Sequence, residues 1–127
     1  MSGYWQIVIR EQDKYKTAFS VQGNHYEFNR MSFGLKSAPA TYQRMMNTVL
    51  CNLLRQHNFV YLDDVLIFGN RLQEHNEQLR NVFEVMRQRN LHLEPDKCEF
   101  LKPKLKYFGH IITPEGVKPD VGRKTRC

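Results

Sequence analysis

The chain has 127 residues, enough for one modest domain with a single hydrophobic core. Its apolar content of 41% indicates a folded globular protein and excludes an intrinsically disordered one. The net charge of +6 is uneven, because residues 102–127 include seven basic and two acidic side chains and so carry +5 of it. A polyanion partner would suit such a segment, although a solvated basic terminus is the more ordinary explanation.

Membrane spans, a secretory signal and disulfides are not expected. The longest apolar run is interrupted by Asp63 and Asp64, so none approaches the roughly 20 residues of a membrane span. The start, MSGYWQIVIREQD, has neither a basic leader nor a cleavage-type site. Cys51, Cys98 and Cys127 are odd in number and far apart, which predicts reduced thiols in an intracellular protein.

The first thirty residues predict three strands. YWQIVI (4–9) is rich in β-branched and aromatic residues, and KTAFSV (16–21) is expected to pair with it. QGNHYEFNR (22–30) begins with a turn signal and continues with aromatic residues at strand spacing.

Two amphipathic helices are expected, over about 39–55 and 72–89. Proline at position 39 suits a first helical turn. The apolar stripe that follows at steps of three and four consists of Tyr42, Met45, Met46, Val49, Leu50 and Leu53. We interpret Met45 and Met46, which belong to this stripe, as core residues. The segment between the helices, NFVYLDDVLIFGN (58–70), predicts a hairpin.

Short strands are expected again after the second helix, in LHLEPDKCEFL (91–101) and KLKYFGHIIT (104–113). The order of strands, helix, hairpin, helix and strands predicts an α+β fold, with a mostly antiparallel sheet covered on one face by two helices. Residues 1–120 are expected to form this domain, and 121–127 a basic, disordered tail.

The adjacent carboxylates of Asp63 and Asp64 stand inside an apolar run. Aspartate tolerates turns, so a solvated turn is one explanation. However, Asp-Asp replaces the favoured Asn-Gly poorly, and apolar flanks limit screening of the two charges. A hard divalent cation, Mg²⁺ or Mn²⁺, would resolve both difficulties. From these residues alone, both explanations remain open.

Several motifs resemble those of reverse transcriptases, specifically of Ty3/gypsy-type LTR retrotransposons. VYLDDVLIF (60–68) resembles the Tyr-x-Asp-Asp box of that family. Segments similar to other family motifs occur in the family's order: SGYWQIVI (2–9), YEFNRMSFGLKSAPATYQRMMN (26–47), NLHLEPDKCEF (90–100) and YFGHIITPEGVKPD (107–120). The resemblance covers nearly the whole chain and implies a palm-type (ferredoxin-like) fold.

The resemblance implies an RNA-directed DNA polymerase. In this chemistry a primer 3′-hydroxyl attacks the α-phosphorus of a dNTP on an RNA or DNA template, assisted by two Mg²⁺ (or Mn²⁺) ions. Asp63 and Asp64 are then expected to be the metal ligands. Lys97 lies near the position of a family lysine that protonates the pyrophosphate; an ordinary surface lysine is the alternative.

Further site residues are implied in the same way. Tyr4 matches the aromatic residue that excludes a ribose 2′-hydroxyl, although a core tyrosine is the simpler interpretation. Phe33, Gly34 and Gln43 belong to the motif beside the nucleotide and template, where Gly34 permits close backbone approach. The primer-grip turn is matched by three consecutive residues, Phe108, Gly109 and His110.

The chain departs from the family at its ends. The third metal-binding aspartate of the family would precede Met1, and no segment matches the fingers, thumb or RNase H parts of a Pol polyprotein. We therefore expect the chain to be inactive alone and to depend on those parts, inside the cell in a particle or the nucleus. Two alternatives remain: a truncated, non-catalytic relic that binds nucleic acid weakly, and a basic RNA-binding module. Paired carboxylates disfavour the module.

Overall fold

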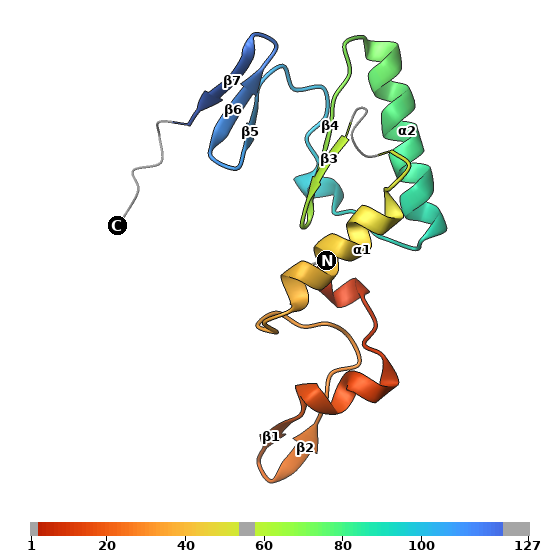
Figure 1. The fold of residues 1–127 in the computed structure, drawn as a ribbon, viewed down its shortest axis with the longest axis vertical. Coiled ribbons are helices and arrows are strands. Elements are labelled where there is room, and N and C mark those ends of the chain that lie inside the picture. The colour runs from red at the N-terminus through yellow and green to blue at the C-terminus, as the bar shows by residue number, and fades with distance from the viewer. Residues whose placement is uncertain (1–2, 54–57, 121–127) are drawn as a thin grey trace. The chain divides into compact units, whose positions relative to one another are not determined.

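The computed structural model describes residues 3–53 and 58–120 (Figure 1). They divide into two compact units, with the boundary between Leu93 and Glu94. Within the described ranges, the first unit holds two α-helices and two β-hairpins, and the second holds a three-stranded sheet. The expected tail at 121–127 lies outside these residues. No helix of the described chain combines the length and the apolar character needed to cross a bilayer.

The strand predicted over 4–9 is wrong. Gly3–Gln6 forms a 3₁₀ helix, and the segment contributes one isolated β-bridge, between Val8 and Arg30. Gly3 and Tyr4 are consecutive and both buried, whereas a strand with one solvent-exposed face buries alternate residues. Packing of this segment therefore overrides its β-propensity.

The second predicted strand forms only in part. Glu11–Thr17 is a 3₁₀ helix, and β1 is confined to Phe19–Val21. Two ion pairs at i,i+3 spacing favour the helical turns, Lys14 with Glu11 at 2.6 Å and Lys16 with Asp13 at 2.7 Å. The expected turn and third strand are present, because β1 pairs antiparallel with β2 (Asn24–Tyr26).

Both predicted α-helices form. Helix α1 spans Ala38–Val49 and α2 spans Leu72–Gln88. Helix α1 ends earlier than expected, because the backbone bond from the Leu53 N–H to the Leu50 carbonyl, at 2.8 Å, tightens the chain beyond it. Residues 54 and 55, at the end of the predicted helix, lie outside the described residues.

The apolar faces of both helices supply the core of the first unit. Its buried hydrophobic residues are Tyr4, Met31, Ala38, Tyr42, Met46, Leu50, Val82 and Met86. Met46 is buried and Met45 packs against this cluster, so the interpretation of both as core residues is confirmed. Gln6 ties the start of the chain to the segment after α2, because its amide exchanges two hydrogen bonds with the backbone of His92, at 2.7 and 2.9 Å.

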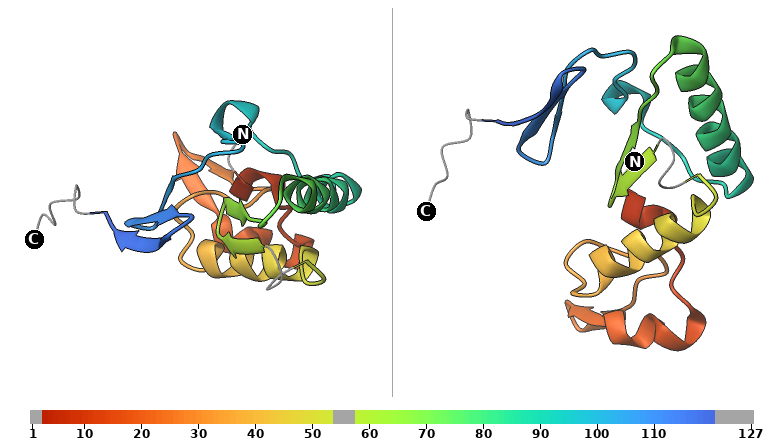
Figure 2. Two further views of the ribbon diagram at one scale, coloured as in Figure 1. Left: turned by 90° about the horizontal axis from the view of Figure 1, so that it is seen from above. Right: turned by 45° about the horizontal axis from the view of Figure 1, so that its top comes forward.

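The predicted hairpin between the helices consists of β3 (Asn58–Tyr61) and β4 (Asp64–Ile67), paired antiparallel. Helix α1 contacts β3 and helix α2 contacts β4, as the views in Figures 1 and 2 agree. Each strand of the hairpin is therefore held in place by contact with a different helix.

The second unit begins with a 3₁₀ turn, Pro95–Lys97, where a strand was predicted. Proline has no N–H to donate to a ladder, which disfavours a strand there. The strand predicted over 104–113 is instead a hairpin of β5 (Leu105–Tyr107) and β6 (His110–Thr113), because Phe108 and Gly109 adopt positive φ between them. Strand β7 (Gly116–Pro119) completes the sheet in the order β5-β6-β7.

The α+β class is confirmed, but the strands of the described residues form three small antiparallel sheets instead of one. Each strand has three or four residues and pairs with a neighbour in sequence. The segment 4–9, which was expected to extend the sheet, is not a strand.

Candidate active site

The two carboxylates lie at the tip of the β3–β4 hairpin. Tyr61 pairs with Asp64, so the connecting residues are Leu62 and Asp63, and Asp64 begins β4. Both aspartates are exposed. Leu62 has a φ of +50°, a left-handed conformation that costs a bulky residue roughly 1–3 kcal/mol. The tip that presents the carboxylates is thus strained.

Gln43, on α1, holds this strained turn. Its side-chain Oε1 accepts a hydrogen bond from the backbone N–H of Leu62 at 2.7 Å, and its Nε2 donates to the carbonyl of Val60 at 3.1 Å. Nε2 also donates to Oδ1 of Asn47 at 2.9 Å. One side chain of a helix therefore satisfies a backbone group at the end of β3 and another in the turn that follows it.

Asp63 is contacted by the hydroxyl of Tyr42, which donates a hydrogen bond to its carboxylate. Burial, followed by the negative charge of Asp63, raises the pKa of Tyr42 to about 12. The backbone of Gly3 lies against both groups: an ideally placed Cβ there would be 2.5 Å from Oδ1 of Asp63 and closer still to the Tyr42 hydroxyl. Three elements therefore meet at the Asp63 carboxylate.

Tyr4 packs in the same place. It is 8% exposed, and its ring makes edge-to-face contacts with Phe33 and Tyr42, with centroids 5.1 and 5.2 Å apart. Burial first, and then the charge of Asp63, raise the pKa of its hydroxyl. Phe33 is 59% exposed, and Gly34 follows it with a φ of +90° and open space around its Cα. The structure thus brings Tyr4, Phe33 and Gln43 together around the turn.

The remaining predicted site residues belong to the second unit. Lys97 ends the 3₁₀ turn, and Phe108 and Gly109 connect β5 to β6 with φ values of +48° and +73°. Asp120 donates its N–H to the carbonyl of Gly109 at 2.8 Å, and Nδ1 of His110 lies 3.0 Å from the carbonyl of Phe108. This turn presents the ring of Phe108, which is 50% exposed.

The donor chemistry at the hairpin fits a hard divalent cation. Two adjacent, exposed carboxylates supply the oxygen ligands that such cations prefer. Among the described residues, no three His, Cys, Asp or Glu side chains are grouped closely enough to hold a metal ion. Asp63 and Asp64 therefore form an incomplete ligand set.

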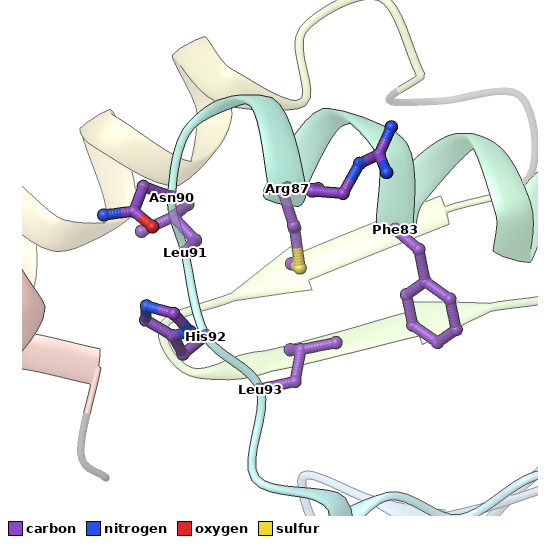
Figure 3. Close-up of a pocket in the computed structure, with 7 residues that line it drawn as sticks. Phe83, Arg87, Asn90, Leu91, His92 and Leu93 are labelled. Carbon is purple, nitrogen blue, oxygen red and sulfur yellow. The ribbon is translucent and has the colours of Figure 1, made fainter.

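A shallow pocket of about 340 Å³ lies elsewhere in the first unit (Figure 3). The end of α2 and residues 90–93 line it, with Phe83 and Leu93 among the apolar groups. None of the residues predicted for the site lines this pocket, so it does not bear on the carboxylate pair.

Sequence reasoning missed Gly3 and assigned Tyr42 only to the apolar stripe. The available signal was the hydroxyl of Tyr42, because a buried tyrosine requires a hydrogen-bond partner. Nothing in the local pattern indicates that the partner is Asp63, 21 positions later. Similarly, the pattern around Gln43 does not reveal that its amide bonds to the turn backbone.

Comparison with known proteins identifies the family of the chain. Residues 1–112 match the family described as reverse transcriptase (RNA-dependent DNA polymerase). The chain is 50% identical over 118 residues to the retrovirus-related Pol polyprotein from transposon 297 of Drosophila melanogaster, covering 93% of this chain and 11% of that protein. It is 37% identical over 119 residues to the Pol polyprotein from transposon gypsy of the same organism, covering 94% of this chain and 12% of that one.

A solved structure of similar fold is the foamy viral protease-reverse transcriptase dRH in complex with double-stranded DNA. It matches with a TM-score of 0.83 at 24% identity, covering 94% of this chain and 21% of that one. The chain thus spans about a tenth of the length of its curated relatives. The family match over residues 1–112 and the identity to the Pol polyproteins show that the chain belongs to the reverse transcriptase family.

Proposed function

We propose that this chain is the palm core of an RNA-directed DNA polymerase from an LTR retrotransposon, acting as part of a longer Pol polyprotein. The observation that carries the proposal is the presentation of Asp63 and Asp64 at a strained hairpin tip that α1 holds through Gln43. Strain retained by surrounding contacts is characteristic of functional sites. The family match supplies the reaction class.

Asp63 and Asp64 would hold divalent cations, Mg²⁺ or Mn²⁺, together with ligands from outside the described residues. When bound, such ions stabilise the attacking and leaving oxygens of a nucleotidyl transfer. The protein's own contribution is positioning. Gln43 fixes the turn backbone and Tyr42 bonds the Asp63 carboxylate, so little reorganisation would be needed on binding.

Tyr4 is proposed to select the sugar of the incoming nucleotide. Its ring is held on two sides, by Phe33 and by Tyr42, and so forms a rigid wall beside Asp63. A rigid wall suits steric exclusion of a 2′-hydroxyl, because a mobile side chain would yield to it. The exposed Phe33 and the open backbone at Gly34 would face the nucleotide and template.

The second unit is proposed to bind the primer through the turn of Phe108, Gly109 and His110, and Lys97 is proposed as a general acid for the pyrophosphate. Template, primer and dNTP would be the partners. Support comes from the foamy viral relatives, which were solved with double-stranded DNA and with an RNA/DNA hybrid. An intracellular location is proposed from the retrotransposon relatives.

The test is primer extension by a chimaera. Residues 3–120 replace the matching segment of the transposon 297 Pol polyprotein, and extension is measured on an RNA template with dNTPs and Mg²⁺. We expect extension by the chimaera, and a loss of more than about 100-fold on Asp63→Asn or Asp64→Asn, since even second-shell changes cost about 10–100-fold. Glu77→Gln, a carboxylate-to-amide change on an exposed part of α2, is the matched control and should leave the rate unchanged.

Two outcomes would contradict the proposal. One is a folded chimaera that does not extend the primer, and the other is full activity after both aspartates are replaced. The 127-residue chain alone should not extend the primer detectably, because correct positioning of the reactants is worth about 7–11 kcal/mol.

A further inference from the structure

Three residues from separate elements meet at one carboxylate: Gly3 on the first 3₁₀ helix, Tyr42 on α1 and Asp63 at the hairpin tip. Tyr42 is 6% exposed, and its ring is fixed edge-to-face against Tyr4. Its hydroxyl therefore has little freedom to move, whereas the Asp63 side chain is exposed. The buried hydroxyl restrains the exposed carboxylate, and not the reverse.

Gly3 leaves the space that this hydroxyl occupies. Any Cβ at position 3 would lie far within normal contact distance of the Tyr42 hydroxyl, of Oδ1 of Asp63 at 2.5 Å and of the ring carbon Cζ of Tyr42 at 2.6 Å. The φ of Gly3 is outside the left-handed region, so an L-residue is compatible with the backbone there. The need for glycine thus comes from Tyr42 and Asp63 rather than from chain conformation.

We infer that Tyr42 is a positioning residue for Asp63 and that Gly3 is its required counterpart. The Tyr42 hydroxyl donates to one carboxylate oxygen of Asp63 and directs the carboxylate toward the cation. The absence of a side chain at position 3 leaves the space in which the hydroxyl lies. The inference rests on the proposed function for its purpose, but the contacts exist without any cation.

The inference predicts a specific coupling between the two positions. Gly3→Ala should displace the Asp63 carboxylate from the Tyr42 hydroxyl, because the fixed ring cannot move away. In a Tyr42→Phe background the same alanine still meets the ring carbon Cζ, 2.6 Å from an ideal Cβ, but no hydroxyl contact to Asp63 is left for it to break. The two substitutions together should therefore weaken Mn²⁺ binding less than the product of their separate effects.

The experiment is a double-mutant cycle in the full 127-residue chain. It compares the wild type, Gly3→Ala, Tyr42→Phe and the double variant by calorimetric Mn²⁺ titration, and by the ¹³C carboxyl NMR signal of Asp63 without metal. Tyr42→Phe should move that signal and weaken Mn²⁺ binding about 10-fold or more, in the range for outer-shell partners. Tyr26→Phe removes an exposed tyrosine hydroxyl on β2 and should change neither.

The outcomes separate this inference from the proposed function. If Tyr42→Phe leaves both the Asp63 carboxyl signal and the circular dichroism spectrum unchanged, the inference is overturned, whatever the effect of the substitution on Mn²⁺ affinity. If Asp63→Asn leaves Mn²⁺ binding intact, the proposed metal role fails, while the carboxyl signal still decides the positioning contact. If Gly3→Ala does not fold, folding restored by Tyr42→Leu, which removes both the hydroxyl and Cζ, supports the coupling, and failure to restore it counts against the role of Gly3.

Discussion

The side-chain oxygen of Gln43 accepts a hydrogen bond from the backbone N–H of Leu62 at 2.7 Å, across 19 positions of sequence. Leu62 carries the strained φ of the hairpin tip, and the next two residues are the proposed metal ligands. A helix side chain thus sets the conformation from which both carboxylates project.

Gln43→Ala should destabilise the first unit. The substitution leaves the N–H of Leu62 and the carbonyl of Val60 without this partner, at a cost of about 1–3 kcal/mol for the unsatisfied groups. Urea unfolding of the metal-free chain measures it. Gln73→Ala removes the same side chain from an exposed position of α2 and should change the free energy of unfolding by less than about 0.5 kcal/mol. Equal effects of the two substitutions would show that Gln43 does not hold the turn.

The stability of the protein should fall at alkaline pH through Tyr42. Burial, and then the Asp63 charge, raise its pKa from 10.0 to about 12 in the folded state. The folded state therefore binds this proton more tightly, so the stabilisation is complete below pH 10 and is lost as the pH rises toward about 12. Urea unfolding of wild type and Tyr42→Phe across this window measures the difference. The same pH slope in both proteins would refute the assignment.

Tyr4→Val should affect both stability and sugar selection. The buried ring contacts Phe33 and Tyr42, so its truncation should cost roughly 3 kcal/mol. In the chimaera, the ratio of ribonucleotide to deoxynucleotide incorporation should rise because the wall is removed. Val82→Ala truncates a core residue of α2 and should lower stability without changing that ratio. A ratio raised equally by both variants would mean that general loosening, and not the wall, alters selection.

Gly109→Ala should destabilise the sheet of the second unit. Gly109 has a φ of +73°, and a left-handed conformation costs an L-residue about 1–2 kcal/mol. Hydrogen exchange of the β5 and β6 amides should accelerate, while the amides of α1 keep their protection. Unchanged exchange in β5 and β6 would contradict the strained turn.

Local patterns predicted both helices and the β3–β4 hairpin, because the apolar stripes and the apolar runs around Asp63 and Asp64 each lie within a few neighbouring residues. The β5–β6 hairpin was not predicted in this way, since KLKYFGHIIT (104–113) reads locally as one strand. The conformation of residues 4–9 could not be predicted from local patterns. Tyr4 is buried by Phe33 and Tyr42, which are distant in sequence, and this packing outweighs the strand propensity of its neighbours.

The site was predicted in part for the same reason. Asp63 and Asp64 are conspicuous as charges in an apolar run, and the resemblance of their surroundings supplied their expected role. The residues that support them are ordinary in composition: a glycine, a stripe tyrosine and a helix glutamine. Their importance depends on long-range contacts that no spacing rule encodes.

The most direct test of the account is the position of a bound Mn²⁺ ion. Paramagnetic broadening of backbone amide signals in the full chain should be centred on residues 61–65 and extend to Gly3 and Gln43, which contact this turn. Asp63→Asn should abolish the broadening, and Glu77→Gln should preserve it. Broadening centred on another part of the chain, or broadening at the hairpin that survives Asp63→Asn, would contradict the claim that this carboxylate pair is the metal site.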